Sequence, residues 1–406
     1  MTTSSDFTLT SSSISATVPR PAIKSLVNIQ TQTISVAEFC QQALSAPLGF
    51  PELVRCVVPG DRVVITVDPE TSFASDIIAA VWEQLQTVPD GGVTLTLLLP
   101  EDHSSLGWQW LRDQLPLHIQ QQIAVHVHSP SDSSQISYIA SSASGERVYL
   151  NRLLSDADLI VTIGTIAFDS LLGFQGTSSI LFPAFSDAST VQSAQSQGHP
   201  ELTPEQQRPF REFVDEVGWL LGTQFTVQVV PGTADRPAAI LAGLPEDVMN
   251  RGKELVESLW RVNVEDMLDG LVISIPGGAV FGWKQLGLAL EQATSVVSQG
   301  GRIVVVADLS VPEGPAATML RRCRDPEELL KPLRREPTYD ATEIAQLIQA
   351  QRRARIYLFS SLPAETVEEF GMIPIADAAE LQRLVSSIQD CGVIPFANYA
   401  WCEVKG

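Results

Sequence analysis

The chain has 406 residues, of which 44% are hydrophobic and 18% are charged, and its formal net charge is −21. This length exceeds one ordinary hydrophobic core and predicts two domains. The acidic excess argues against nucleic acid or an anionic membrane as partner, because phosphate binding needs a basic patch. The composition is that of a globular protein that its charge keeps in solution.

Cysteine usage and terminal composition indicate the compartment. The five cysteines, at positions 40, 56, 323, 391 and 402, show no CxxC or other paired spacing. Their scatter is unlike a disulfide framework or a zinc knuckle. The chain does not start with a basic stretch followed by an apolar one, and no apolar run reaches the roughly 18–20 residues of a membrane span. We therefore expect a cytoplasmic protein.

The first part of the chain predicts an α/β domain. Residues 1–30 are rich in serine and threonine and are expected to form a flexible arm or an edge segment. A short helix is expected at 35–44, where Ser35 and Glu38 have the spacing of a capping box. Strands are then expected at 62–67, 93–99, 123–128 and 159–163, and helices at 75–86 and 105–115. This alternation predicts a mainly parallel sheet with helices on both faces.

The rest of the chain repeats this pattern. Helices at 203–221 and 245–262 flank a predicted hairpin at 224–230 and 238–241. Further strands are expected at 271–275, 302–307, 356–359 and 393–396, and further helices at 284–298, 341–354 and 376–389. We place the domain boundary near 265. The expected architecture is an α/β domain at 31–265 and a second α/β domain at 266–406, with a cleft between them.

Candidate site residues follow the predicted strands, where side chains and backbone amides can converge on a ligand. The candidate loops are 68–72 (DPETS), 100–105 with His103, 169–179, and 276–278 (PGG). Residues 158–185 are the most informative segment, because a buried strand there runs into a loop with Gly173 and Gly176. These glycines either allow a tight turn or expose amides to a phosphate or carboxylate. The loop has no His, Lys or Cys for chemistry.

Other chemical signatures are sparse. The chain has no GxGxxG after a strand, no GxxxxGK[ST] and no GxSxG. His126 and His128 lie two residues apart on a predicted strand and so share a face that suits a metal, although no third ligand is apparent. His118 and His199 are expected at the surface. The expected core tryptophans, which lie on apolar helical faces, are Trp82, Trp219 and Trp260.

The order and spacing of several segments resemble the lactate racemase family, the enzymes that use a nickel-pincer nucleotide. The resemblance covers roughly residues 30–400. The segments that carry it are PGDRVVITVDPETS, PEDHSS, ERVYLNRLLSDADLIVTIG, LLGFQGTSSILFPAF, DGLVISIPGG and GGRIVVVAD. The resemblance implies the two-domain α/β fold of that family. It also implies a nickel ion in a modified pyridinium ring, which accepts a hydride while a His takes the hydroxyl proton.

The family's functional residues can be carried over position by position. His103 falls at the first catalytic His, and Asp169 at the second. The Lys that tethers the cofactor falls on Ser179, and the His that ligates nickel falls on Gln195. A serine hydroxyl cannot form a lysine-type tether, and a glutamine amide is a poor nickel ligand compared with an imidazole. Asp169 can serve as a general base if burial raises its pKa.

The anion-binding positions also differ. Thr71 is kept, but Ser72 replaces the family's Arg and Pro69 replaces its Asp, so a planar two-pronged anion clamp is lost. The polar Gln and Lys of the second domain fall on Gly287 and Leu290. His103 can equally be a hydrogen-bonded structural residue, since one surviving His is not a mechanism.

Two functions follow from this resemblance. The first is a divergent racemase or epimerase for a small 2-hydroxy acid or related polar substrate, with His103 and Asp169 as proton-transfer groups. Its cofactor-binding residues would be Thr71, Ser72, Gly173, Gly176 and Ser179. The second is a non-catalytic homologue that binds a small molecule in the interdomain cleft. The family implies a nickel-pincer nucleotide as cofactor, but the sequence supplies no metal ligand, since Gln195 stands at that position. An NAD-type oxidoreductase rests on fold alone.

Overall fold

The structure is a computed structural model, and it divides into two compact units. The central unit comprises residues 29–194 and 201–256, and the terminal unit comprises residues 1–28, 195–200 and 257–406. The described residues are 7–11, 14–18, 24–27, 29, 33–89, 92–101, 107–195, 198–199, 201–203, 205–277, 282–312 and 314–405. The domain boundaries expected from the sequence stay a prediction.

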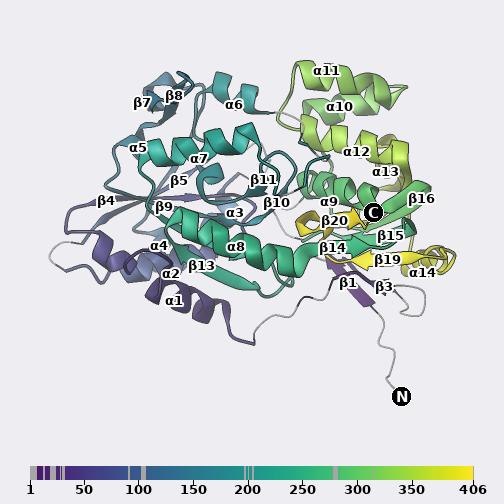
Figure 1. Cartoon of the computed structure of the whole chain (residues 1–406), viewed down its shortest axis with the longest axis horizontal. Helices are drawn as coiled ribbons and strands as arrows, with labels where there is room; N and C mark the ends of the chain where they lie inside the picture. The colour runs from purple at the N-terminus through teal and green to yellow at the C-terminus, as the bar shows by residue number, and fades with distance from the viewer. Residues whose placement is uncertain are drawn as a thin grey trace. The chain divides into compact units, whose positions relative to one another are not determined.

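The central unit is built on a six-stranded sheet with the order β13-β12-β9-β4-β5-β6 (Figure 1). The strands are β4 (Arg62–Val67), β5 (Thr94–Leu99), β6 (Ala124–Val127), β9 (Leu159–Thr165), β12 (Phe225–Val230) and β13 (Ala239–Gly243). Only β12 and β13 pair in antiparallel fashion, as the predicted hairpin requires, and the other pairs are parallel. The mainly parallel sheet predicted from the sequence is confirmed.

Helices cover both faces of this sheet. One apolar cluster joins alternate strand residues to α1 (Val36–Ser45), α2 (Ala74–Leu85) and α3 (Gln109–Gln114). A second apolar cluster joins the strand residues that point to the other face of the sheet to α5 (Arg152–Ser155) and α7 (Pro209–Leu221). Because strand side chains alternate between faces, each face buries its own apolar row. The predicted capping box of α1 is confirmed, since Ser35 and Glu38 bond each other's backbone amides.

The other elements of this unit are one long helix, α8 (Pro245–Trp260), and several short segments. The short segments are η2 (Leu53–Cys56), α4 (Leu117–Gln120), η3 (Ser133–Gln135), β7 (Ile136–Ser141), β8 (Arg147–Asn151), β10 (Ala167–Asp169), β11 (Gly173–Gln175), η4 (Thr177–Ile180) and α6 (Ala188–Ala194). Strands β7 and β8 form an antiparallel hairpin, as do β10 and β11. Neither hairpin was predicted from the sequence.

The terminal unit has its own six-stranded parallel sheet, ordered β18-β17-β16-β15-β19-β3. Its strands are β3 (Lys24–Ser25), β15 (Leu268–Ser274), β16 (Val297–Val306), β17 (Ala354–Phe359), β18 (Ile373–Pro374) and β19 (Cys391–Ile394). A separate parallel pair joins β14 (Arg261–Val264) to β20 (Trp401–Val404). Its helical segments are α9 (Trp283–Val296), α10 (Pro315–Arg322), η5 (Pro326–Leu329), α11 (Leu330–Arg335), α12 (Ala341–Arg353), α13 (Ala364–Glu369), α14 (Ala378–Ser386) and η6 (Ala397–Tyr399).

The N-terminal segment departs from the flexible arm predicted for residues 1–30. Strands β1 (Phe7–Ser11) and β2 (Ile14–Val18) form an antiparallel hairpin. Leu9, Ala16 and Val18 are buried in a cluster with the β15–β16 face of the terminal sheet and with α14. Alternating burial of apolar residues along a strand stabilises it despite the Ser and Thr content. The alternative expectation of an edge segment fits β3, which lies at the edge of the sheet.

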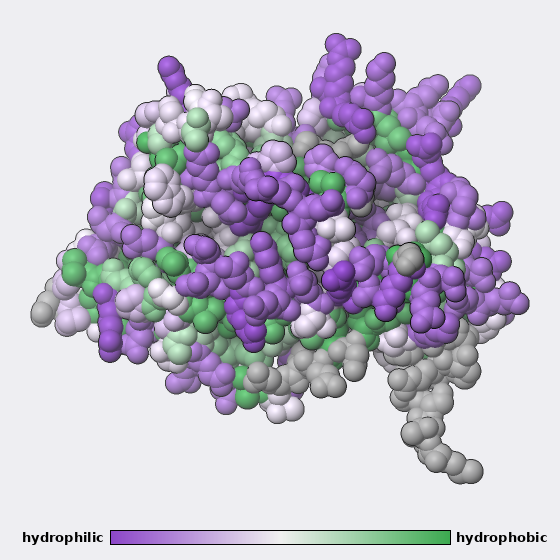
Figure 2. All heavy atoms as spheres, in the orientation of Figure 1, coloured by the Kyte–Doolittle hydropathy of each residue, from purple (hydrophilic) through white to green (hydrophobic). Residues whose placement is uncertain are grey.

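Two further observations concern the surface. On the face shown in Figure 2, hydrophilic side chains predominate, in keeping with the strong acidic excess. Trp82 and Trp260 are buried, as predicted, but the prediction for Trp219 is wrong because 78% of that residue is exposed. Among the described segments, no helix is both long and apolar enough to cross a bilayer.

Candidate functional site: the glycine loop of the central unit

The glycine loop, residues 166–180, begins where the central strand β9 ends. All seven residues of β9 are buried, and the chain then forms the small β10–β11 hairpin. Asp169 pairs with Gly173 across this hairpin. The Asp169 carboxylate is half-buried, and its Oδ1 accepts hydrogen bonds from the amides of Leu171 (2.9 Å) and Leu172 (2.8 Å). The side chain predicted as a proton-transfer group thus closes the turn between two strands.

The two glycines of the loop are required by its backbone. Gly173 has φ 78° and Gly176 has φ 112°, which side-chain-bearing residues rarely adopt. A Cβ on Gly176 would also lie about 3.0 Å from Gln228 Oε1, 3.0 Å from Ile166 Cγ1 and 3.1 Å from the Thr165 carbonyl. Of the two interpretations drawn from the sequence, the tight turn accounts for both positions.

Ser179, at the family's lysine position, is fully engaged in the same turn. Its Oγ accepts a hydrogen bond from the Gly176 amide (2.8 Å) and donates to the Gly176 carbonyl (3.2 Å). The Ser179 amide donates to that carbonyl as well, at 3.3 Å. The hydroxyl therefore caps η4 from within the loop, and the Gly176 amide is not open to an anion.

Two arginines near the start of α7 hold the glycine loop from outside. Arg208 is 2% exposed and donates to the carbonyl of Ser170 (3.0 Å) and to carbonyls at 202, 203 and 206. Arg211 donates to the carbonyls of Phe174 (2.9 Å) and Gly176 (3.3 Å). Each arginine thereby connects the loop to α7.

Arg211 uses all five of its N–H groups inside the protein. Beyond the two carbonyls, Nη2 donates to Thr177 Oγ1 (3.2 Å), and a bidentate pair joins Nη2 and Nε to the Asp215 carboxylate (2.6 and 2.9 Å). A guanidinium has five N–H donors, so none is left for a ligand. Arg211 is a positioning residue for the loop and has no N–H group left to clamp an anion.

A row of buried polar side chains underlies the loop. Thr162 Oγ1 donates to Thr226 Oγ1 (2.7 Å), and Gln228 Nε2 donates to the same oxygen (2.6 Å). Gln228 Oε1 lies close to the glycine backbone at 164 and 176 and has no hydrogen-bond partner. Thr66, which pairs with Thr162 in the sheet, also has an unpartnered Oγ1. Polar atoms buried in this way normally find partners, so the row marks an exceptional part of the sheet.

The loop after β4 adds a further unpartnered hydroxyl. Asp68 Oδ1 accepts from the Glu70 amide (3.0 Å), and the Thr71 amide donates to the Asp68 carbonyl (3.0 Å), which makes a tight turn before α2. Thr71 is 2% exposed, and its Oγ1 lacks a partner. Ser72 is half-buried beside it. Thr165, at the end of the neighbouring strand β9, has a third such hydroxyl.

The remaining predicted positions fall outside the described residues or in the other unit. His103 lies outside the described residues, as does Gly278. Gln195 directly follows α6 and belongs to the terminal unit, whereas Asp169 and Ser179 belong to the central unit. The prediction that 103, 169, 179 and 195 share one site therefore stays a prediction.

The two positions carried over to the second domain have structural roles. Gly287 and Leu290 lie on α9, and both are buried. A Cβ on Gly287 would lie 2.3 Å from Gln346 Oε1 on α12. The missing side chain thus lets two helices approach closely, and neither residue offers a polar group to a ligand.

His128 is a buried structural residue. Its Nε2 donates to the Ser186 carbonyl (2.8 Å), and its Nδ1 accepts from Asn151 Nδ2 (2.9 Å), so the neutral ring is satisfied at both nitrogens. Burial is the main cause that lowers the pKa of His128. His126 is exposed on β6, whereas His128 is buried just beyond the end of that strand, so the two rings lie in different surroundings. The exposed positions of His118 and His199 are confirmed.

Metal-binding chemistry is not apparent in the part of the chain that the structure describes. There, no group of three or more His, Cys, Asp or Glu side chains is placed to hold an ion. The thiols of Cys40 and Cys391 are buried, which raises the pKa of each to about 12 and keeps them protonated at neutral pH. The five cysteines are all free thiols, as their spacing predicts.

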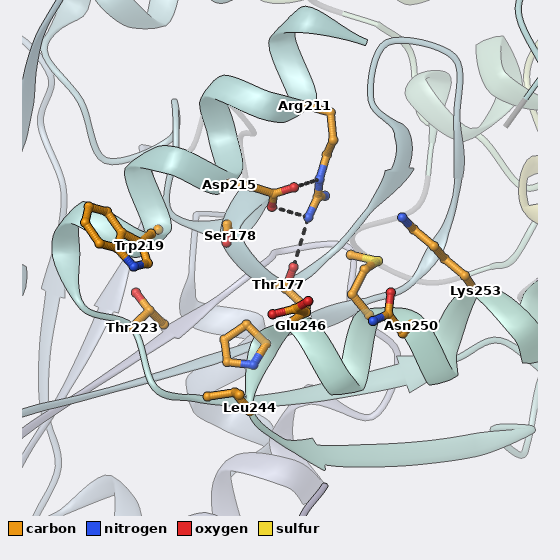
Figure 3. A pocket seen from close by; sticks show the side chains of 13 residues that line it. Thr177, Ser178, Arg211, Asp215, Trp219, Thr223, Leu244, Glu246, Asn250 and Lys253 are labelled. Atoms are coloured by element: carbon orange, nitrogen blue, oxygen red, sulfur yellow. Dashed lines mark hydrogen bonds and ion pairs between the residues drawn. The ribbon is translucent and has the colours of Figure 1, made fainter. Parts of the chain in front are cut away.

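A pocket of about 450 Å³ lies beside the glycine loop, within the central unit (Figure 3). Its walls are formed by α7 and the start of α8, and Thr177 and Ser178 of η4 line it as well. Neither this pocket nor the role of Arg211 was predicted from the sequence. The Arg211–Asp215 spacing of four residues on a helix does indicate an ion pair, but it cannot indicate contacts with a loop 37 residues earlier.

This fold, with a glycine-bearing loop after a buried central strand, defines an α/β protein of the type that places ligand sites at strand ends. Comparison with known proteins narrows the class. Residues 10–201 match the family described as the lactate racemase N-terminal domain. No curated protein sequence matches the chain.

Two solved structures resemble the chain in fold. The lactate racemase apoprotein from Thermoanaerobacterium thermosaccharolyticum has a TM-score of 0.81 at 18% identity, over 98% of this chain and 100% of that one. A protein from Thermotoga maritima has a TM-score of 0.69 at 16% identity, over 91% of this chain and 98% of that one. Residues 10–201 therefore match a lactate racemase N-terminal domain, and nearly the whole chain has the fold of the lactate racemase apoprotein.

Proposed function

We propose that this lactate racemase-like protein binds a small polar molecule at the strand ends of the central sheet without the family's lysine-tethered nickel-pincer chemistry. The observation that carries the proposal is the closed turn at Ser179, whose hydroxyl bonds both the amide and the carbonyl of Gly176. A residue used in this way holds the loop shut on itself. We also propose that the protein is cytoplasmic.

The described residues do not fit the family cofactor. Ser179 supplies no amine for a tether, and Asp169 Oδ1 already accepts two hydrogen bonds in the turn of the β10–β11 hairpin. The buried thiols of Cys40 and Cys391 stay protonated, so they are poor ligands for nickel. We therefore derive no catalytic step through that group.

Ligand binding is supported by the polar atoms that the protein itself leaves unpartnered. Thr71 lies in the loop after β4, and Thr165 is the last residue of the adjacent strand β9; both have buried hydroxyls without a partner. They lie at the carboxyl ends of the strands, where α/β proteins bind ligands. A buried hydroxyl without a hydrogen bond costs about 1–3 kcal/mol. A ligand with hydroxyl or carboxylate groups would offset that cost.

A divergent racemase or epimerase for a 2-hydroxy acid is the second candidate. It is favoured by the likeness of fold over nearly the whole length of the Thermoanaerobacterium enzyme. In this version His103 and Asp169 transfer protons at the substrate carbon and hydroxyl. Asp169 would then need to give up its turn hydrogen bonds or use its second oxygen.

One experiment separates the two candidates. The protein is co-expressed with the proteins that make the cofactor, and it is then assayed with D- and L-lactate and other 2-hydroxy acids. Interconversion is followed by chiral chromatography, and binding by thermal shift. The proposal predicts a thermal shift with at least one acid and no interconversion.

The contrary result is interconversion that is lost in Asp169→Asn and His103→Ala but kept in the matched control Asp266→Asn, an exposed carboxylate of the terminal unit. That pattern would establish the racemase. No thermal shift and no interconversion with any acid would remove both candidates for this substrate class.

A further inference from the structure

A pocket lies between α7 and α8, and its lining does not include the strand-end residues Thr71 and Thr165. Figure 3 shows Trp219 and Thr223 at one end and Asn250 and Lys253 at the other, with Asp215 and Ser178 between them. Its volume of about 450 Å³ lies within the roughly 300–1,000 Å³ of small-molecule sites.

Local sequence features keep this pocket open. Gly218 on α7 allows the helix to approach η4, since a Cβ there would lie 2.4 Å from Ser178 Oγ. Residues Glu246, Asn250 and Lys253 recur every three or four positions on α8, so their side chains lie on one face of that helix. The lining therefore comes from two regular helices and a braced loop, which makes it a preformed site.

The charges of the pocket argue against an anionic ligand. Arg211 lines the pocket, but all five of its N–H groups are used by Asp215, Thr177 and two carbonyls. The other cation, Lys253, has its Nζ 5.5 Å from the centre of the Phe174 ring. Asp215 and Glu246 balance the two cations, so the lining has no net charge. A neutral ligand fits this balance.

The groups that can still receive a ligand are acceptors and an aromatic face. The Asp215 side chain is 51% exposed despite its pairing with Arg211, and a carboxylate has about four lone-pair sites. Glu246 adds a second carboxylate, and Asn250 adds an amide that both donates and accepts. Trp219 leaves its indole exposed at the rim, where covering it removes apolar surface from water.

We propose that this pocket binds a neutral, hydroxyl-rich ring of the pyranose type. The C–H face of such a ring stacks on the indole of Trp219, whose π-face is electron-rich. Its hydroxyls donate to the carboxylates of Asp215 and Glu246 and exchange hydrogen bonds with Asn250. The pocket shares only the glycine loop, through Thr177 and Ser178, with the surroundings of the strand-end site. The inference therefore does not depend on the proposed function.

Isothermal titration calorimetry on the full chain tests the proposal with methyl β-D-glucopyranoside, methyl β-D-galactopyranoside and N-acetylglucosamine, each up to about 20 mM because single-ring affinities are weak. Inorganic phosphate and ethylammonium serve as charged probes. We expect at least one glycoside to bind and to shift the tryptophan emission. Trp219→Ala should weaken its binding at least tenfold, and Glu246→Gln about fivefold.

A matched control is Tyr138→Ala, which removes another exposed aromatic ring outside the pocket and should leave binding unchanged. The proposal is overturned if no glycoside binds, or if phosphate or ethylammonium binds in their place. Glycoside binding that Trp219→Ala does not weaken would also overturn the proposal, whatever the effect of Tyr138→Ala.

Discussion

The sheets of the two units share a parallel design but differ in what they bury. In the central sheet, the face toward α7 carries Thr66, Thr162, Thr226 and Gln228, all fully buried, and two of these have polar atoms without partners. In the terminal sheet, the buried residues of β15 and β16 are leucine, valine and isoleucine, apart from Gly270 and Ser274. Its buried Ser274 accepts a hydrogen bond from the Phe396 amide (3.2 Å).

The difference shows where the chain departs from a simple packed core. A parallel sheet covered on both faces needs only apolar residues for stability. The central sheet instead places polar atoms directly beneath the glycine loop, with Gln228 Oε1 against the backbone of Gly164 and Gly176. Unpartnered buried polar groups are few in native proteins, and a binding or catalytic role is one reason for them. The central unit is therefore where we expect ligand chemistry.

Among the variants considered, substitution of Arg211 should lower the stability most, because Arg211 holds the glycine loop beside the buried polar row. Arg211→Met removes the hydrogen bonds that the guanidinium donates to the Asp215 carboxylate and to the Phe174 and Gly176 carbonyls. We expect the free energy of unfolding to fall by about 3–4 kcal/mol, because several hydrogen bonds to a charged group that is only 11% exposed are lost together. Urea unfolding followed by circular dichroism measures it.

The control for Arg211 is Arg251→Met, which breaks an exposed pair with Glu254 on α8 (2.8 Å) and should change the stability by no more than about 0.5 kcal/mol. Equal effects of the two variants would mean that the loop brace adds nothing beyond a surface ion pair.

Gly176→Ala tests the closeness of the loop to the polar row. The added Cβ meets three atoms at about 3.0–3.1 Å in a backbone conformation that favours glycine. We expect a loss of about 2–3 kcal/mol from strain and displacement. Gly145→Ala is the matched control, because it has φ 87° but open space around the Cβ, and it should cost only about 1 kcal/mol. A cost at Gly176 no larger than at Gly145 would refute the close approach.

Removing one hydroxyl from each sheet should change the stability in opposite directions. Thr66→Val replaces an unpartnered hydroxyl with a methyl of similar shape and should raise the free energy of unfolding by about 1 kcal/mol. Ser274→Ala in the terminal sheet removes a bonded hydroxyl and should lower it by about 1 kcal/mol. Urea unfolding measures both changes. If the free energy of unfolding changes in the same direction in both variants, the two sheets do not differ in the way we describe.

The smallest expected effect is a pH dependence confined to the central unit. Burial lowers the pKa of His128 below its ordinary value of about 6.5, so the unfolded chain binds the proton more readily than the folded one. Stability should be unaffected by this group above that pH and should fall as the pH drops from there towards the lowered pKa. Hydrogen exchange of the central unit at pH 7 and pH 5 measures the effect.

His128→Gln keeps an amide donor and acceptor but cannot be protonated in this range, so it should flatten the pH dependence. His118→Gln, at an exposed ring, should leave it as in the unchanged chain. A pH dependence that survives His128→Gln in full would assign it to other groups.

Much of the regular structure could be predicted from local sequence patterns. The β-branched run at 62–67 and the Ser35–Glu38 capping box correspond to observed elements residue for residue. The helix predicted over 203–221 begins only at Pro209, because Arg208 and its carbonyl partners hold the preceding residues in a turn. The hairpin at 7–18 was missed, because its Ser and Thr content suggested an arm, whereas burial against the terminal sheet decides its structure.

The candidate site was less accessible to prediction. The positions of Asp169, Gly176 and Ser179 follow from motif order, but their hydrogen bonds within one turn depend on backbone geometry that the sequence does not specify. Arg211 and Gln228 act through residues far away in the chain, and local pattern reasoning does not reach such contacts. Trp219 was expected in the core because it lies on an apolar helical face, yet the structure leaves it at the pocket rim.

The central claim, that the turn at Ser179 has closed the family's cofactor anchor, is tested most directly by the intact mass of the protein purified after co-expression with the cofactor-making proteins. We predict the mass of the unmodified chain and no stoichiometric nickel in the same sample. A mass increased by a covalently bound pincer nucleotide, with about one nickel per chain, would contradict the account.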